Sequence, residues 1–508
     1  MLPTPWASSD KSRVSRFHSC TTSLLVFFSS WISLSAPGGK QPLLPDAPLG
    51  NLAQLLINSV NSGDPTRWAS FADAAISSAG QKMTPREEYA ALLKKIYSQS
   101  GGIEIKEVLP QRRPSELRIL VHGKRNDRWA TLFMTLDDRE AGKLIGLGIV
   151  PTDHPELAKW PKQKMVEAEL IDEVKRHVKE AADADRFSGV VLVGKGDRII
   201  VHQAYGLAER SFKVPNNVET KFNLGSMNKM FTSVAIAQLS QQGRLSFNDS
   251  LAKVLPEYPN QATAKQITIH HLLTHTAGLG DIFKPELREH RERYLKPSDY
   301  FPLFANEPLL FTPGSQWAYS NAGFVVPGAV IEKVSGQSYF DYVREHIYRP
   351  AGMVDSDSWE LTEVVPNLAV GYLRSEDDPF GMEERRSNIA FLPWKGSPAG
   401  GGYSTARDLF RFGQALRSHR LLTERLTEEV TSGKVATGGG AKYGYGFVAQ
   451  GVEGKEVRGH SGGGPHAGIN SDLEMFWDGS YVVAVTSNYD APAAQNLAKE
   501  IVKFLAIQ

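Results

Sequence analysis

A serine and a lysine three positions apart, Ser226 and Lys229, are the residues of this chain whose types and spacing point most directly to chemistry. Positions i and i+3 lie on the same face of a helix, so the serine hydroxyl and the lysine amine can meet. A serine hydroxyl becomes nucleophilic when a neighbouring base removes its proton, and a partly desolvated lysine can serve as that base. We therefore predict that residues 223–231 place a nucleophilic serine at the start of an amphipathic helix.

The spacing alone is weak evidence, because the same Ser-x-x-Lys tetrad begins at Ser8 and again at Ser250. The surroundings of Ser226 are more informative. Residues 188–193 and 198–205 have the composition of strands and are joined by a tight turn with two glycines, which predicts an antiparallel hairpin ahead of the serine. The helix that follows is expected to end at Gly243, since glycine is the usual residue at a helix C-terminus.

Two further short motifs follow Ser226 along the chain. They are, in chain order, Tyr319-Ser-Asn321 and His460-Ser461-Gly462-Gly463. Each has a chance counterpart, at Tyr258-Pro-Asn260 and at His466-Ala-Gly468, so the evidence lies in the order and placement of all three motifs. The apolar segment after the first motif contains Pro327, which predicts a kink or an early helix end.

A pair of histidines gives the only pattern that suggests a metal. His271 and His275 are spaced i, i+4 and could in principle share an ion. No glutamate follows His271 and no further ligand is in sight, so the zinc-peptidase pattern is absent. We interpret this segment as a structural helix end and expect neither a metal nor a cofactor.

Together the three motifs resemble those of the serine β-lactamase-related hydrolases, a family that includes penicillin-binding proteins, class C β-lactamases, D-amino-acid peptidases and esterases. The resemblance covers residues 165–508 and extends to the flanking segments 272–279, 311–314 and 403–406. It implies an α+β fold of the β-lactamase/transpeptidase type, with an additional all-helical subdomain. The pattern of the chain agrees, because strand-like segments at both ends of this region, with helices between them, predict one antiparallel sheet flanked by helices.

The resemblance also implies the catalytic roles. Ser226 is then the acylating nucleophile and Lys229 its partner base. Tyr319 stands where many relatives have serine, and a phenol beside a lysine ammonium can be held as, or near, a phenolate and pass protons to the serine and the leaving group. Whether the lysine or the tyrosine is the working base stays open, because the two titrations are coupled.

The third motif departs from the commonest pattern of the family. His460 stands where lactamases usually carry lysine, and Ser461 where threonine is frequent. A lysine is a permanent cation suited to a substrate carboxylate, whereas a histidine is mostly neutral at pH 7. The resemblance implies that these residues and Asn321 contact the substrate, and that the N–H of Gly463 joins that of Ser226 in an oxyanion hole. The histidine weakens a β-lactamase assignment and leaves the acyl-transfer chemistry unchanged.

The expected function is therefore that of a serine hydrolase that forms and hydrolyses an acyl-enzyme, with an esterase or D-amino-acid peptidase as the leading interpretation. The substrates of this hydrolase are expected to be small esters, amides or peptides. A β-lactamase or DD-carboxypeptidase is the alternative within the enzymes. The alternative that is not an enzyme is an acylated sensor, or a degenerate penicillin-binding-type protein, that forms the acyl adduct and does not hydrolyse it.

The chain ahead of this region is expected to fall into four parts. Residues 1–36 have the basic, apolar and small-residue segments of a secretory signal, which indicates a secreted or periplasmic protein. Residues 37–50 and 151–164 are rich in proline or glycine and are interpreted as linkers. Residues 51–150 contain three helical patterns followed by four strand-like segments, which predicts a small α+β domain whose layout resembles the nuclear-transport-factor-like cone.

Composition excludes several kinds of partner. The formal net charge of +1 gives no reason to expect nucleic acid or an anionic membrane surface. The apolar run near the N-terminus is too short to span a bilayer, so no integral span is expected in the mature chain. The single cysteine, Cys20, excludes an intramolecular disulfide. The oligomeric state is left open.

Overall fold

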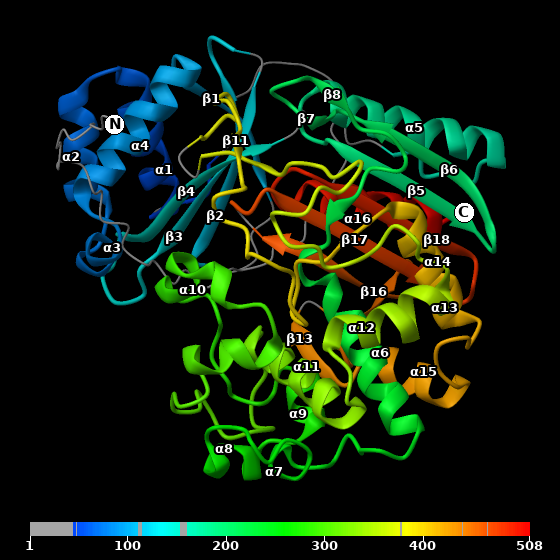
Figure 1. Cartoon of the computed structure of the whole chain (residues 1–508). Helices are drawn as coiled ribbons and strands as arrows, with labels where there is room; N and C mark the ends of the chain where they lie inside the picture. Colours follow the sequence, from blue (N-terminus) through cyan, green and yellow to red (C-terminus); the bar gives the residue numbers. More distant parts are fainter. Residues whose placement is uncertain are drawn as a thin grey trace, which may run out of the picture. The chain divides into compact units, whose positions relative to one another are not determined.

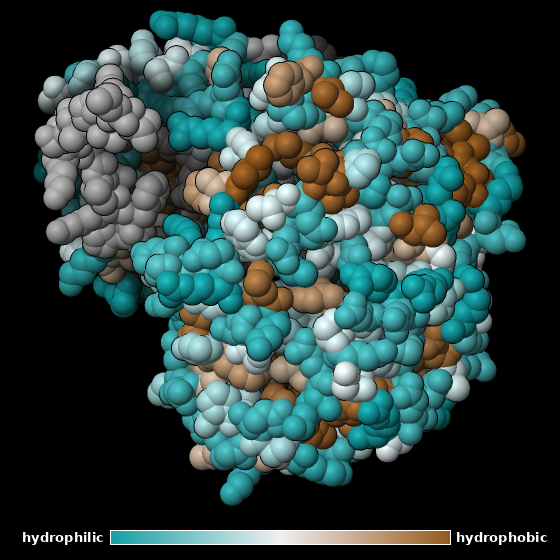
Figure 2. Space-filling view, viewed as in Figure 1, coloured by the Kyte–Doolittle hydropathy of each residue, from teal (hydrophilic) through white to brown (hydrophobic). Residues whose placement is uncertain are grey.

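The computed structural model describes residues 44–46, 48–109, 114–126, 128–152, 160–375, 378–438, 440–464 and 466–508. The predicted signal, residues 1–36, lies outside these. Contacts divide the chain into two compact units, Met1–Thr152 and Asp153–Gln508. Among the described residues, no helix combines the length and the apolar character that a membrane crossing requires. Figure 2 shows that the visible surface is mostly hydrophilic, with apolar side chains in small separate groups.

The first unit consists of helices followed by an antiparallel sheet (Figure 1). Its helices are α1 (Leu49–Ser62), α2 (Pro65–Ala75), α3 (Ser78–Met83) and α4 (Arg86–Ser100). Its strands are β1 (Ile103–Leu109), β2 (Glu116–Gly123), β3 (Trp129–Leu136) and β4 (Leu144–Thr152), hydrogen-bonded in that order. Helices α1, α2 and α4 each bury one apolar face, as their periodicity predicts, whereas the short α3 buries only Gly80.

The ends of these elements follow from local chemistry. Asp64 caps α2 by accepting a hydrogen bond from the Thr66 N–H at 2.8 Å, and Pro65 occupies the first helical position. Two boundaries differ from the sequence-based expectation. Helix α1 begins at Leu49, within the predicted linker. Strand β4 continues to Thr152, and it can contain Pro151 because β4 is an edge strand of its sheet.

The second unit is built on an eight-stranded antiparallel sheet of order β13-β14-β15-β16-β17-β18-β5-β6. Its strands are β5 (Gly189–Lys195), β6 (Arg198–Tyr205), β13 (Val435–Gly438), β14 (Ala441–Tyr443), β15 (Val448–Val452), β16 (Lys455–Gly464), β17 (Ile469–Phe476) and β18 (Tyr481–Ser487). The short strands β7 (Leu207–Glu209), β8 (Val214–Pro215), β9 (Phe222–Asn223), β10 (Tyr372–Leu373), β11 (Arg386–Ser387) and β12 (Tyr403–Ser404) form separate two-stranded pairs. Because β18 pairs with β5, the sheet joins both ends of this unit, as predicted.

Helices occupy the middle of the second unit and both faces of its sheet (Figure 1). The longer ones are α5 (Glu167–Asp183), α6 (Asn228–Gln241), α11 (Ala322–Ser335), α14 (Ala406–Arg417), α15 (Glu424–Thr431) and α16 (Ala493–Ala506). The shorter ones are α7 (Leu251–Val254), α8 (Gln261–Gln266), α9 (Ile269–Leu273), α10 (Pro285–Glu289), α12 (Tyr339–Val343) and α13 (Arg349–Ala351). The remaining helical segments are the 3₁₀ helices η1 (Gly225–Met227), η2 (Arg291–Arg293) and η3 (Pro297–Leu303) and the π-helix η4 (Arg344–Tyr348).

The alternation of side chains along each strand divides this unit into two cores. On β5, Val191 and Val193 pack with residues of α5 and α16. Val190 and Leu192 point to the opposite face and join a larger core formed with α6, α11 and α14. The period of two explains why β5 is apolar throughout: both of its faces are covered.

One predicted feature of the helices differs in the structure, and of the two alternatives predicted for the segment around Pro327 one is excluded. Helix α6 is buried on nearly every side from Asn228 to Leu239, so it is not amphipathic. A helix enclosed by other elements has no water-facing side to carry its polar residues, and in α6 Lys229, Thr232 and Ser233 are buried among the apolar ones. Helix α11 runs to Ser335 with Pro327 inside it, so the helix does not end early. Its residues from Ala322 to Ile331 are buried, and this packing holds the helix together despite the missing N–H.

Candidate active site

Ser226 lies in the single turn η1, immediately before α6. Gly225 precedes it with a φ of +50°, and its N–H donates to Asn223 Oδ1 at 2.9 Å. A Cβ on Gly225 would lie 2.2 Å from the Gly463 nitrogen. Only glycine fits this turn, because it accepts the positive φ and lets strand β16 approach the serine.

Lys229 is fully buried on α6, and its amine contacts three oxygen atoms. The Nζ atom lies 3.0 Å from Ser226 Oγ, 2.8 Å from Asn321 Oδ1 and 2.6 Å from the Ala399 carbonyl oxygen. The structure therefore brings together the serine and lysine that the sequence singled out. Burial lowers the pKa of Lys229 to about 7, while the carboxylate of Asp281 acts in the opposite direction.

Tyr319 completes the group around the serine. Its side chain lies close to Ser226, whose hydroxyl acts to lower the pKa of the phenol, and Lys229 Nζ lies 4.7 Å from the centre of its ring. The lysine amine lies over the ring, and its hydrogen-bond partners in the described part of the chain are Ser226, Asn321 and Ala399. Although 41% of the residue is exposed, desolvation of its hydroxyl end raises the pKa of Tyr319, so a phenol and not a phenolate is favoured.

Asn321 connects the lysine to a residue that sequence reasoning missed. Its Oδ1 accepts from Lys229, and its Nδ2 donates to the Asp281 carboxylate at 3.0 and 3.2 Å. The Asn321 backbone N–H also donates to Asp281 Oδ2 at 3.3 Å. Asp281 lies just beyond the predicted 272–279 segment, and an acidic residue in a loop carries no local signal that could have marked it.

His460 lies on strand β16 with both ring nitrogens engaged. Its Nδ1 lies 2.5 Å from the Ser461 carbonyl oxygen and therefore carries the hydrogen. Its Nε2 accepts from the hydroxyl of Tyr443 at 2.9 Å. Burial, with a smaller contribution from Lys229, lowers the pKa of His460 to about 3, so the ring is neutral.

The remaining residues of the third motif follow on the same strand. Ser461 is half-buried and pairs in register with Asp472 of β17. Gly463 has a φ of +95°, and a Cβ there would lie 1.8 Å from the Ile469 carbonyl oxygen. The Gly463 backbone therefore lies against the turn that holds Ser226, where the predicted oxyanion hole would be.

His275 and Tyr443 are further residues at the site to which the sequence gave no catalytic role. The ring of His275 packs 4.3 Å from that of Tyr319 and 4.6 Å from that of Tyr443. Its Nδ1 accepts from the Ser320 N–H at 3.1 Å, which fixes the start of the second motif. His271, by contrast, completes a capping box at the start of α9. The two histidines thus have different structural tasks.

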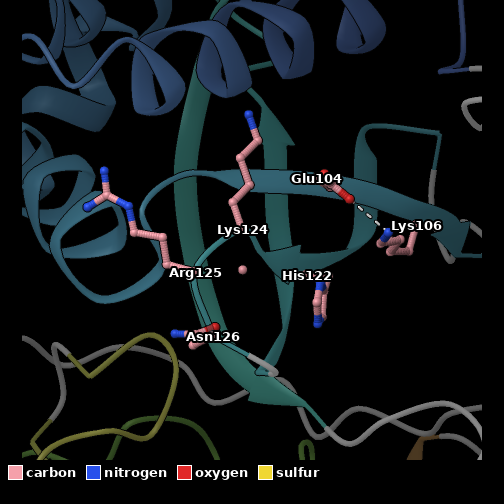
Figure 3. A pocket seen from close by; sticks show the side chains of 7 residues that line it. Glu104, Lys106, His122, Lys124, Arg125 and Asn126 are labelled. Atoms are coloured by element: carbon pink, nitrogen blue, oxygen red, sulfur yellow. Dashed lines mark hydrogen bonds and ion pairs between the residues drawn. The ribbon is translucent and has the colours of Figure 1, made fainter.

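The first unit carries a hollow lined by β1, the end of β2 and the turn that follows β2 (Figure 3). The side chains labelled there are Glu104, Lys106, His122, Lys124, Arg125 and Asn126. Lys106 donates to Glu104 at 2.8 Å, so two of the charges neutralise each other. Its lining residues include no serine, threonine or cysteine that could act as a nucleophile. The serine and lysine that the sequence singled out meet in the second unit.

Comparisons with known proteins agree with this geometry. The family model described as Beta-lactamase matches residues 174–506. Penicillin-binding protein 4* of Bacillus subtilis is 32% identical over 293 residues, covering 55% of this chain and 64% of that protein, slightly less than two thirds of its length. Esterase EstB of Burkholderia gladioli is 30% identical over 294 residues, covering 51% and 74%. The crystal structure of a penicillin-binding protein from Bacillus halodurans aligns with a TM-score of 0.57 at 30% identity, covering 68% of this chain and all of that one. These likenesses confirm the predicted β-lactamase/transpeptidase-like fold.

Proposed function

The chain belongs to the Beta-lactamase family, whose members are serine hydrolases, and we propose that it hydrolyses small carboxylic esters through an acyl-enzyme on Ser226. One observation carries the proposal. The hydroxyl of Ser226 lies 3.0 Å from the amine of Lys229, and burial brings the pKa of that amine to about 7. A lysine poised near neutral pH can act as a general base.

The proposed reaction begins with proton transfer from Ser226 Oγ to the neutral amine of Lys229. The serine oxygen then bonds to the substrate carbonyl carbon, and the carbonyl oxygen takes the negative charge. The N–H groups of Ser226 and Gly463 stabilise this oxyanion, a contribution whose loss typically lowers the rate about a hundredfold or more. The leaving alkoxide departs with the proton that Lys229 took from Ser226. Water then attacks the acyl carbon while Lys229 takes a proton from it, the bond to Ser226 Oγ breaks, and return of that proton to Oγ restores the serine as the acid is released.

The neutral His460 supports esters over substrates that carry a carboxylate. A β-lactam or the C-terminus of a D-peptide presents an anion, which a permanent cation would bind. Here the third motif offers an imidazole whose pKa lies near 3. A D-amino-acid amide or ester lacks that anion and remains compatible with the site, whereas the β-lactamase and DD-carboxypeptidase alternatives are less well supported.

The test uses the purified chain with p-nitrophenyl acetate and butyrate, a chromogenic cephalosporin and a D-Ala-D-Ala peptide, with intact mass recorded in parallel. Ester hydrolysis is expected to exceed cleavage of the other two, and S226A should abolish it. The matched control is S250A, which alters the chance tetrad whose Lys253 is engaged with Asp249 at 2.5 Å. Turnover that survives in S226A would overturn the nucleophile, and a stable adduct without turnover would favour the sensor.

We also propose that the protein is exported, on the basis of the basic, apolar and small-residue pattern of residues 1–36. The first unit is proposed to serve binding or scaffolding and not catalysis. N-terminal sequencing of the protein recovered from the medium or periplasm tests the first proposal. Retention of the full-length chain inside the cell would contradict it.

A further inference from the structure

The amine of Lys229 has partners that differ in what they can do with a proton. The Ala399 carbonyl oxygen and Asn321 Oδ1 can only accept hydrogen bonds, whereas the Ser226 hydroxyl can donate or accept. A neutral amine has two hydrogens and one lone pair. When the two hydrogens go to the two obligate acceptors, the lone pair faces the serine hydroxyl, which is the arrangement that proton removal requires.

This arrangement depends on which end of the Asn321 amide faces the lysine. If the amide were turned over, its Nδ2 would present a hydrogen to the amine and compete with Ser226 for the lone pair. A carboxylate accepts and cannot donate. Because Asp281 lies 3.0 and 3.2 Å from Nδ2, it holds the amide nitrogen on the far side and keeps Oδ1 toward Lys229.

Asp281 is itself held in place. Its Oδ1 accepts from the Phe283 N–H at 3.2 Å, and its Oδ2 accepts from the Asn321 N–H at 3.3 Å. The carboxylate is therefore tied to its own loop and to the start of α11. The Asp281 carboxylate therefore holds the Asn321 amide in one orientation, because the loop and the start of α11 would both have to move before the amide could turn.

We propose that Asp281 is a positioning residue that fixes the Asn321 amide and thereby directs the lone pair of Lys229 at Ser226. The inference rests on the proposed function, because it assigns a task within the same reaction. Asp281 touches neither Ser226 nor Lys229 by hydrogen bond. It acts through Asn321 and through its charge.

The charge gives the proposal a measurable signature. The titratable groups that face Lys229 are Asp281, Tyr319, His275 and His460. Of these, Asp281 is the anion, and it acts to raise the pKa of the lysine against the effect of burial. Removing that negative charge must lower the pKa of Lys229, so the pH at which the base becomes active moves down.

The experiment compares wild type, D281N and D281E by kcat/KM for p-nitrophenyl acetate as a function of pH. For D281N, in which an amide can donate as well as accept, we expect kcat/KM to fall about tenfold or more, which is part of the roughly 10²–10⁴-fold that a general base contributes. The acid limb should also shift to lower pH. D281E keeps an acceptor-only carboxylate, so its acid limb should stay near that of wild type and its rate should exceed that of D281N.

A thermal melt of each variant separates positioning from folding. D183N is the matched control, because Asp183 is an exposed aspartate on α5 paired with Lys179. A wild-type rate in D281N, or a lowered rate without movement of the acid limb, would overturn the proposal. Titration of the Lys229 Cε resonance by NMR in wild type and D281N measures the same change in the Lys229 pKa without an activity assay. The proposal can therefore be tested even if S226A shows that Ser226 is not the nucleophile.

Discussion

Tyr443 donates its phenolic hydrogen to Nε2 of His460 across 2.9 Å, and the hydrogen on Nδ1 of the same ring goes to the Ser461 carbonyl oxygen. Both nitrogens are thus satisfied while the imidazole is neutral, and its pKa of about 3 keeps it so at any ordinary assay pH. The third motif presents an uncharged ring held in one orientation. This relationship, and not the histidine alone, distinguishes the site from one built to bind an anion.

Replacing Tyr443 with phenylalanine tests the importance of that orientation. Y443F leaves the buried Nε2 of His460 without a donor, which should lower the free energy of unfolding by about 1–3 kcal/mol. It should also lower kcat/KM for p-nitrophenyl esters, because the ring is free to turn. Denaturant unfolding and steady-state kinetics measure the two effects.

The matched control is Y445F. Tyr445 makes the same kind of bond, 2.8 Å to His270 Nδ1, on helix α9. Its loss should destabilise the fold to a similar degree and leave kcat/KM unchanged. Equal activity in Y443F and Y445F would show that the Tyr443–His460 bond serves folding alone.

The pH dependence of kcat/KM should report the lysine. A general base works in its deprotonated form, so activity should rise with pH through a midpoint near the Lys229 pKa of about 7. His460, with a pKa near 3, and Tyr319, whose pKa is raised, should contribute no acid limb in that region. A rate that is flat between about pH 6 and 8 would contradict the assignment of the base.

Gly225 should prove irreplaceable. A Cβ there would lie 2.2 Å from the Gly463 nitrogen and would push strand β16 away from the serine. G225A should therefore lower kcat/KM on the order of a hundredfold, as the loss of an oxyanion donor does. The assay is ester hydrolysis, with circular dichroism to verify the fold.

G243A provides the control for backbone conformation alone. Gly243 also has a positive φ, +70°, but a Cβ there meets nothing within 4 Å. This substitution should cost about 1 kcal/mol of stability and leave activity intact. A G225A protein as active as G243A would show that the approach of β16 is not needed.

Much of the fold could be predicted because its signals are local. Neighbouring residues alone determine the alternation along a strand, the proline or glycine at a helix end and the apolar stripe of α5. The prediction that α6 is amphipathic was wrong, because exposure to water is not a local property of the sequence. Whether a helix face meets water depends on which elements surround it, and α6 lies at the centre of its unit.

By itself the sequence determined the pairing of Ser226 with Lys229, because an i, i+3 spacing at a helix start places both on one face whatever surrounds them. Only the tertiary structure decided what the pair can do. Asn321 lies 92 positions from Lys229, and Asp281 lies 40 positions from Asn321. The pKa of a buried amine depends on desolvation and on distant charges, and no local pattern encodes either.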